Sequence, residues 1–372
     1  MTVVLLILAA LLLSYANGAN DNFKAVATVY GSSTLSYRAA LRLATAAQLA
    51  GSIASVFLAG ALLKAFSGEG LVPEATVADP RFLLAVGLAA TATVLLATRL
   101  GMPVSTTHAM IGGLVGAGLA VAPTQLLWSG LAGKFVFPLL VTPALAAAVA
   151  AVIYPIARTA RRRLGIDEVS CVCIAERIEP VAVTGRGEMV VARTGVVLTA
   201  DQAGQCQRRY EGSVVGISAQ RILDCLHLTS AAALGFARGL NDTPKIMAIL
   251  VGAAWSGLGA TTSLLLIAVV MAAGGLLHSG RIAATLGTRI TQMNHGQGFV
   301  ANIVASSLVI GASVIGSPVS TTHISTGAIF GIGLWTGKAN WNVVGQIVGA
   351  WVATLPLALL LGYVVALACA GI

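Results

Sequence analysis

Charged residues are scarce in this chain. Only 9% of its 372 residues are Asp, Glu, Lys or Arg, whereas soluble domains carry about 25%. Hydrophobic residues make up 57% of the chain, and its mean hydropathy is +0.90. A soluble globular protein is therefore excluded, and the composition is typical of an integral membrane protein.

Charge is also missing from long stretches of the sequence. A helix needs about 20 apolar residues to span a bilayer. The apolar runs that reach or approach this length are 2–17, 39–63, 82–98, 109–122, 135–157, 217–237, 260–277, 299–315, 322–335 and 343–371. Several are short, which predicts broken or re-entrant helices in an all-α polytopic membrane protein.

Enzyme motifs are absent. An intramembrane aspartyl protease should carry Gly-x-Gly-Asp, but the sequence ending at Asp242 is Gly-Leu-Asn-Asp. No His-Glu-x-x-His zinc motif occurs. The five cysteines are an odd number, which argues against a disulfide framework. Cys171, Cys173 and Cys206 are expected to be reduced thiols, with a metal site among them as the less favoured alternative. The chain is predicted not to be an enzyme.

The net charge of +9 does not indicate nucleic-acid binding, because the basic residues form no exposed domain face. Their densest run is Arg158, Arg161, Arg162 and Arg163, directly after an apolar stretch. Arginine beside the end of a span marks the cytoplasmic side. We therefore expect a multi-pass protein of the cytoplasmic membrane, with lipid rather than nucleic acid around it.

Two motifs each occur twice. Gly18-Ala19-Asn20-Asp21 recurs as Gly239-Leu240-Asn241-Asp242, an offset of 239 − 18 = 221. Pro-Val-Ser-Thr-Thr-His at 103–108 recurs unchanged at 318–323, an offset of 318 − 103 = 215. Because order and spacing are preserved, the sequence predicts a duplication. The first membrane repeat is 1–157, an insert is 158–216, and the second repeat is 217–372.

The insert interrupts the apolar pattern. Short β-prone runs at 181–183, 189–191 and 196–198 are separated by turns that contain glycine. This pattern predicts a small strand-rich cytoplasmic domain. A passive linker between the halves is the favoured role, and regulation is the alternative.

The repeated hexapeptides have the chemistry of an anion site. Proline interrupts a helix, and serine or threonine suits the start of the next one. A helix start offers unpaired N–H donors and about half a positive charge. Transporters with paired repeats commonly aim such starts at an anion near the bilayer midplane. The candidate donors are Ser105, Thr106, Thr107, Ser320, Thr321 and Thr322. Together they suit a tetrahedral oxyanion, although the segments could simply be capped helix starts.

The Asn-Asp pairs border apolar helices, where an ionisable side chain is expensive and usually functional. Asp21 and Asp242 are candidates to bind a coupling cation or to accept the proton of hydrogen phosphate. Asn20 and Asn241 offer amide oxygens for sodium and amide donors for an anion. The alternative is that all four are interfacial residues at helix ends.

These two motifs, each present once in each half, resemble those of the inorganic phosphate transporter (PiT) family of cation-coupled symporters. The resemblance covers nearly all of both halves and omits 158–216. It implies an inverted-repeat helical bundle with two re-entrant hairpins, assembled as a homodimer. It also implies phosphate between the two Ser-Thr-Thr segments, sodium at Asn20, Asp21, Asn241 and Asp242, and no other cofactor.

The chain departs from the family pattern symmetrically. The family motif has asparagine three residues after the aspartate, whereas this chain has Lys24 and Lys245 at the two matching positions. Gln48 also stands where the family has an acidic residue. An Asp and a Lys three residues apart share a helix face and can pair. We hypothesise that the lysines replace at least one coupling sodium ion. The alternative is that they snorkel to the membrane surface.

The function predicted from these features is secondary active transport of inorganic phosphate, coupled to protons or sodium. Sulfate is the closest rival substrate, because it is also tetrahedral but has no proton to donate to Asp21 or Asp242. The two carboxylates favour phosphate, while the added lysines weaken that preference. A passive anion channel would look similar but would not accumulate its substrate against a gradient.

Overall fold

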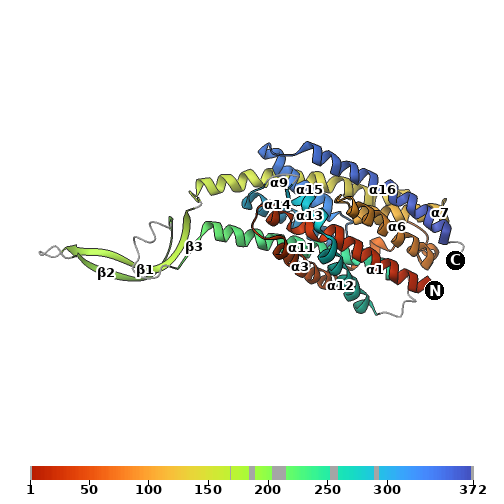
Figure 1. The fold of residues 1–372 in the computed structure, drawn as a ribbon, viewed down its shortest axis with the longest axis horizontal. Helices are drawn as coiled ribbons and strands as arrows, with labels where there is room; N and C mark the ends of the chain where they lie inside the picture. Colours follow the sequence, from red (N-terminus) through yellow and green to blue (C-terminus); the bar gives the residue numbers. More distant parts are fainter. Residues whose placement is uncertain are drawn as a thin grey trace. The chain divides into compact units, whose positions relative to one another are not determined.

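The computed structural model describes residues 2–167, 169–183, 189–202, 215–251, 259–288 and 293–369. The chain divides into two compact units. One contains Met1–Ile153 with His227–Ile372, and the other contains Tyr154–Leu226. The first unit is a bundle of helices, and the second contains a small antiparallel sheet (Figure 1).

The helices of the first half begin with the first residues described. They are α1 Thr2–Asp21, the 3₁₀ helix η1 Asn22–Val26, α2 Ala27–Gly31, α3 Tyr37–Leu58, α4 Gly60–Phe66, α5 Glu74–Val77, α6 Pro80–Arg99, α7 Thr106–Val121, α8 Trp128–Leu131, the π-helical turn η2 Ala132–Val136 and α9 Phe137–Arg163. The helices of the second half are α11 Ala219–Val251, α12 Ala260–His278, α13 Gly280–Thr288, α14 His295–Val314, α15 Thr321–Thr336 and α16 Trp341–Cys369.

Helix boundaries recur between the halves at the offset of the hexapeptides. Both ends of α6 and α14 differ by 215, since 295 − 80 = 215 and 314 − 99 = 215. Both ends of α7 and α15 also differ by 215, since 321 − 106 = 215 and 336 − 121 = 215. Even the N-caps correspond, because Asp79 caps α6 and Asn294 caps α14 through their side-chain oxygens. The two halves therefore share local structure as well as sequence motifs.

The halves are interlocked by close helix contacts. A Cβ atom on Gly116 of α7 would lie 2.0 Å from the backbone oxygen of Leu359 in α16. A Cβ atom on Gly331 of α15 would lie 2.1 Å from the backbone oxygen of Ala147 in α9. Only glycine permits backbones to approach this closely, as is usual where membrane helices pack. In both pairs, α7 with α16 and α15 with α9, one helix comes from the first half and the other from the second half.

Seven helical segments among the described residues are long and apolar enough to cross a membrane. They are Thr2–Gly31, Tyr37–Leu58, Pro80–Arg99, Trp128–Arg163, Ala260–His278, His295–Val314 and Trp341–Cys369. The prediction of an all-α polytopic membrane protein with a small strand-rich insert is confirmed. The 33-residue helix α11 is not among these seven segments.

The second unit contains a three-stranded antiparallel sheet in the order β2-β1-β3. Its strands are β1 Ser170–Val183, β2 Met189–Gln202 and β3 Val215–Ser218. The predicted runs at 189–191 and 196–198 are parts of the single strand β2, so the glycine between them does not form a turn. The pairing of β1 with β2 shifts register between Glu176 and Ile178 and again between Pro180 and Ala182. Such bulges accommodate a proline that cannot donate a ladder hydrogen bond.

Candidate functional site: two facing helix starts and a buried charge cluster

The two hexapeptides form matching helix starts. Ser105 is the N-cap of α7 (φ −96°, ψ 114°), and Ser320 is the N-cap of α15 (φ −101°, ψ 113°). Each serine Oγ accepts a hydrogen bond from the backbone N–H three residues on, that of His108 or His323, at 3.2 Å. The expectation of proline followed by a capped helix start thus describes both segments.

Each start leaves backbone donors unused. In the part of the chain that the structure describes, the N–H groups of Thr106 and Thr107 have no hydrogen-bond partner, and neither do those of Thr321 and Thr322. All four residues are buried. Unpaired N–H groups at the positive end of a helix dipole are an anion-binding arrangement.

The two starts are hydrogen-bonded to each other. Thr107 Oγ1 donates to the backbone oxygen of Val319 at 3.1 Å, and Thr322 Oγ1 donates to that of Val104 at 3.0 Å. The helix starts from the two halves therefore face each other. The hydroxyl protons of Thr107 and Thr322 are therefore used in hydrogen bonds between the halves. The hydroxyls of Thr106 and Thr321 take no part in these bonds.

Lys24 and Lys245 complete this link. Lys24 Nζ donates to Asp21, to the Val104 carbonyl at 2.7 Å and to Thr322 Oγ1 at 2.7 Å. Lys245 Nζ donates to Thr107 Oγ1 and the Val319 carbonyl, both at 2.8 Å, and to Asp242 at 3.5 Å. The side chains are 2% and 1% exposed, so the lysines do not snorkel. Each ammonium group contacts both halves of the protein.

The asparagines of the repeated motif hold neighbouring structure. Asn20 Nδ2 donates to Thr98 Oγ1 at 2.9 Å and to the Met102 carbonyl at 3.1 Å, and its Oδ1 accepts the Val104 N–H at 3.2 Å. Asn241 Nδ2 donates to Asp242 at 3.0 Å, and its Oδ1 accepts from Ser313 Oγ at 3.2 Å. Asn20 thus ties the segment before α7 to α1 and α6.

The motif glycines allow helices to approach closely. A Cβ atom on Gly18 would lie 1.8 Å from the backbone oxygen of Met271, and one on Gly239 would lie 2.0 Å from that of Gln48. This packing seats the Asn-Asp pairs deep in the bundle. Gln48 itself donates to Ser52 Oγ at 2.7 Å, and Ser52 hydrogen-bonds Thr243 at 2.7 Å. Gln48 therefore belongs to a neutral network between α3 and α11.

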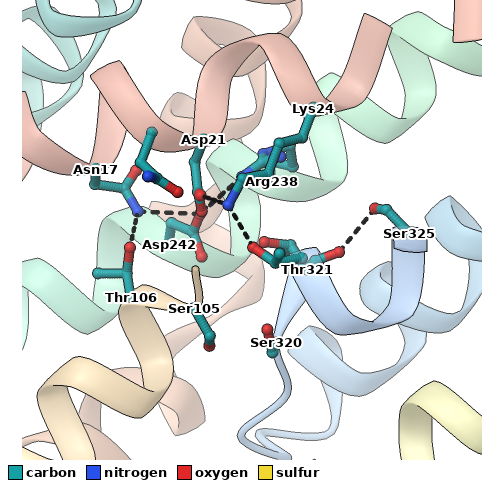
Figure 2. Close-up of polar contacts among 12 residues, drawn as sticks. Asn17, Asp21, Lys24, Ser105, Thr106, Arg238, Asp242, Ser320, Thr321 and Ser325 are labelled. Carbon is teal, nitrogen blue, oxygen red and sulfur yellow. Dashed lines mark hydrogen bonds and ion pairs between the residues drawn. The ribbon is translucent and has the colours of Figure 1, made fainter. Parts of the chain in front are cut away.

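Arg238 is a charged residue of this site that the sequence interpretation missed. It lies in α11, 3% exposed, with Nη2 2.6 Å from Asp21 Oδ2 and 3.9 Å from Asp242 Oδ2. A signal was available, because 238 − 221 = 17 aligns Arg238 with the polar residue Asn17. Asn17 Nδ2 contacts Asp242 Oδ2 at 3.4 Å and Thr106 Oγ1 at 2.9 Å. Figure 2 shows Asn17 and Arg238 with both aspartates.

Five formally charged side chains thus gather beside the helix starts. They are Asp21, Lys24, Arg238, Asp242 and Lys245, each at most 3% exposed. Three positive charges and two negative charges give this cluster a net formal charge of +1. A buried charge without a counter-charge is costly. The arrangement is therefore suited to holding an anion.

Sodium does not fit the oxygen atoms of the Asn-Asp pairs as they stand. Each carboxylate oxygen of Asp21 and Asp242 has a side-chain nitrogen within 3.4 Å. The amide oxygens of Asn20 and Asn241 already accept hydrogen bonds. A sodium ion at these atoms would have to displace lysine or arginine.

The histidines that end the two hexapeptides lie in contact with each other. The rings of His108 and His323 have centroids 4.4 Å apart, and the ring of His323 lies 3.9 Å from that of Trp351. Among the described residues, neither ring nitrogen of His323 has a hydrogen-bond partner, and neither does Trp351 Nε1. Packing against Trp351 of α16 therefore accounts for the position of His323.

The fold and the buried polar centre define a polytopic membrane protein of the transporter class. Residues 17–362 match the family model described as the phosphate transporter family. The chain belongs to the phosphate transporter family, which is a family of transporters and not of enzymes. The resemblance identified from the two motifs is confirmed.

Individual relatives agree with this assignment. The chain is 28% identical to a protein of Mycobacterium bovis named "Probable low-affinity inorganic phosphate transporter", over 96% of this chain and 75% of that one. A protein of Mycobacterium tuberculosis with the same name matches to the same extent. A solved structure titled "The sodium-dependent phosphate transporter" has a TM-score of 0.75 at 19% identity, covering 100% of this chain and 99% of that chain. This last similarity establishes the fold.

Proposed function

We propose that this protein is a secondary active transporter of inorganic phosphate, with the anion bound between the starts of α7 and α15. The observation that carries the proposal is the set of four unpaired N–H groups beside a cluster of formal charge +1. The hydroxyls of Ser105, Thr106, Ser320 and Thr321 supply further donors. The family membership and the names of the relatives support phosphate as the substrate.

Coupling without sodium follows from the charge cluster. Lys24 and Arg238 bind the two oxygens of Asp21, so fixed cations occupy the place where a mobile cation would bind. Lys245 and Asn17 contact the two oxygens of Asp242. The proposed transport is therefore coupled to protons, with Asp21, Asp242 and the two lysines setting the charge that accompanies the substrate.

Uptake of labelled phosphate into proteoliposomes tests both parts of this proposal. Sodium and pH should be varied independently, with potassium replacing sodium. The expected result is accumulation driven by an inward proton gradient, unchanged in sodium-free buffer. A strict sodium requirement would contradict the coupling proposal alone. Equilibration without accumulation would indicate the passive channel, and no uptake under any condition would contradict phosphate transport.

Sulfate remains a second candidate because of one specific observation. Hydrogen phosphate has a proton that needs an acceptor, yet all four carboxylate oxygens at the site already have nitrogen partners within 3.4 Å. Sulfate only accepts hydrogen bonds and needs no such group. Excess unlabelled sulfate in the same uptake assay distinguishes the two, since a sulfate transporter loses phosphate uptake to competition.

The membrane arrangement completes the proposal. The helices α7 and α15 have 16 residues each, about 24 Å of helix, which is less than the bilayer core of about 30 Å. They are proposed as arms of re-entrant hairpins in an inverted repeat. Arginines 161–163 in the last turn of α9 support a cytoplasmic insert. A homodimer in the cytoplasmic membrane is the proposed assembly.

A further inference from the structure

Arg238 breaks the symmetry of the site. Its counterpart Asn17 makes two contacts, one with the aspartate of the other half and one with Thr106. Arg238 makes the first kind of contact, through Nη2 and Asp21 at 2.6 Å. The second kind is lacking. Among the described residues neither Nη1 nor Nη2 makes a hydrogen bond, and Nη1 has no ion pair either, although the side chain is only 3% exposed.

An unpaired guanidinium nitrogen in a buried site is unusual. Buried polar atoms are nearly always hydrogen-bonded, and buried charges are paired. Arginine presents a planar fork of donors that matches the oxygens of phosphate or sulfate. The ion pair with Asp21 occupies one side of this fork and fixes its position. Nη1 has no partner among the described residues, so it remains available as a donor on the other side of the fork.

The charges at the site indicate how highly charged its ligand is. The side chains sum to a formal charge of +1, of which Arg238 supplies one positive charge. The two helix starts add about half a positive charge each. The site thus presents about two positive charges in all, which a doubly charged anion neutralises. Without Arg238, the site presents about one positive charge, which a singly charged anion neutralises.

We propose that Arg238 binds the substrate directly through Nη1 and makes the site selective for doubly charged tetrahedral oxyanions. The proposal rests on the function proposed above and adds the ionisation state of the substrate. Wild-type protein therefore binds hydrogen phosphate and sulfate dianions in preference to dihydrogen phosphate. Arg238 is a specificity-determining residue, and its counterpart Asn17 has only a positioning role in the first half.

The test is ligand-induced thermal stabilisation of the full-length protein in nanodiscs. Sulfate and inorganic phosphate are titrated separately at pH 6 and pH 8. Sulfate stays a dianion at both values, whereas phosphate changes from mainly monoanion to mainly dianion. Wild-type protein should bind sulfate equally at the two values and phosphate more tightly at pH 8.

The variant Arg238→Gln should lose at least about tenfold in affinity for sulfate, as expected for a lost hydrogen bond to a charged group. It should also prefer phosphate at pH 6, the reverse of wild type. The surrounding groups that titrate are Asp21 and Lys24 at the end of α1 and in η1, Asp242 and Lys245 on α11, and the imidazoles of α7 and α15. Because sulfate keeps its charge, its response separates titration of these groups from that of the ligand.

The double variant Arg238→Gln with Asp21→Asn separates binding from charge pairing. It restores the formal charge of +1 and removes the Asp21 carboxylate oxygen that loses its partner when Arg238 is replaced, so its thermal stability should recover. Its sulfate affinity should stay at least about tenfold below wild type. Full recovery of sulfate affinity would overturn the proposal, since Arg238 would then act only as the counterion of Asp21.

Controls keep the outcomes distinct. Arg81 is half exposed and pairs with Asp79 at 3.6 Å, so Arg81→Gln should bind both anions as wild type does. Arg238→Lys keeps the charge and serves if Arg238→Gln does not fold, and it too should lose sulfate affinity. Unchanged affinity in either Arg238 variant overturns this inference alone. A wild-type protein that neither anion stabilises overturns this inference and the proposed function together.

Discussion

Replacing Thr321 by valine should reduce phosphate binding by at least about tenfold, because a buried hydroxyl donor to a charged ligand is lost. Thr321 is the first residue of α15 and is 2% exposed. Its hydroxyl has no part in the link between the halves, which uses Thr107 and Thr322. Valine keeps the branched shape, so the helix start should persist. Equilibrium binding of labelled phosphate to purified protein measures the effect.

Two comparisons make this result specific. Thr336 lies at the other end of α15 and donates to the Ile332 carbonyl at 2.9 Å, so Thr336→Val should bind phosphate normally. Thr106→Val should behave like Thr321→Val, with a further loss because Thr106 Oγ1 accepts from Asn17 at 2.9 Å. Normal phosphate binding by both Thr321→Val and Thr106→Val would refute the proposed site.

Replacing Lys245 by methionine should destabilise the protein by about 3–5 kcal/mol, the usual result when one partner of a buried ion pair is removed. Lys245 is 1% exposed and donates to Thr107, Val319 and Asp242, so its loss also removes part of the link between the two halves. The free energy of unfolding in mixed micelles, measured by titration with a denaturing detergent, gives the size of the effect.

The double variant Lys245→Met with Asp242→Asn is the matched control. It removes both charges, so it should be more stable than Lys245→Met alone, although the contacts with Thr107 and Val319 stay lost. If Lys245→Met were as stable as wild type, the lysine would not be a buried partner of Asp242.

The repeated motifs allowed most of the fold to be predicted, because two motifs that recur in the same order and at nearly the same offset indicate a duplication. The membrane class followed from composition, and the capped helix starts followed from Pro, Ser and Thr in that order. The strands were placed less well. Residues 189–191 and 196–198 belong to one strand, since a glycine inside a paired strand does not oblige the chain to turn.

Roles within the site were harder to predict than its position. Six hydroxyls were treated alike, yet Thr107 and Thr322 face the opposite helix start and bond its carbonyls. Which hydroxyl faces the other half depends on how each helix is rotated about its axis relative to its partner from the other half. The local sequence does not specify that rotation. Arg238 was missed because the repeated motifs are recognised by identical residues, whereas position 17 holds asparagine. A comparison of polar positions at the same offset would have found it.

The most direct test of the central claim is an experimental structure of the protein with phosphate bound. We expect phosphate density between the starts of α7 and α15, within hydrogen-bond distance of the N–H groups of Thr106 and Thr321 and of the Arg238 guanidinium. Phosphate bound elsewhere in the bundle, or a sodium ion coordinated by Asp21 and Asp242 in place of the lysines, would contradict it.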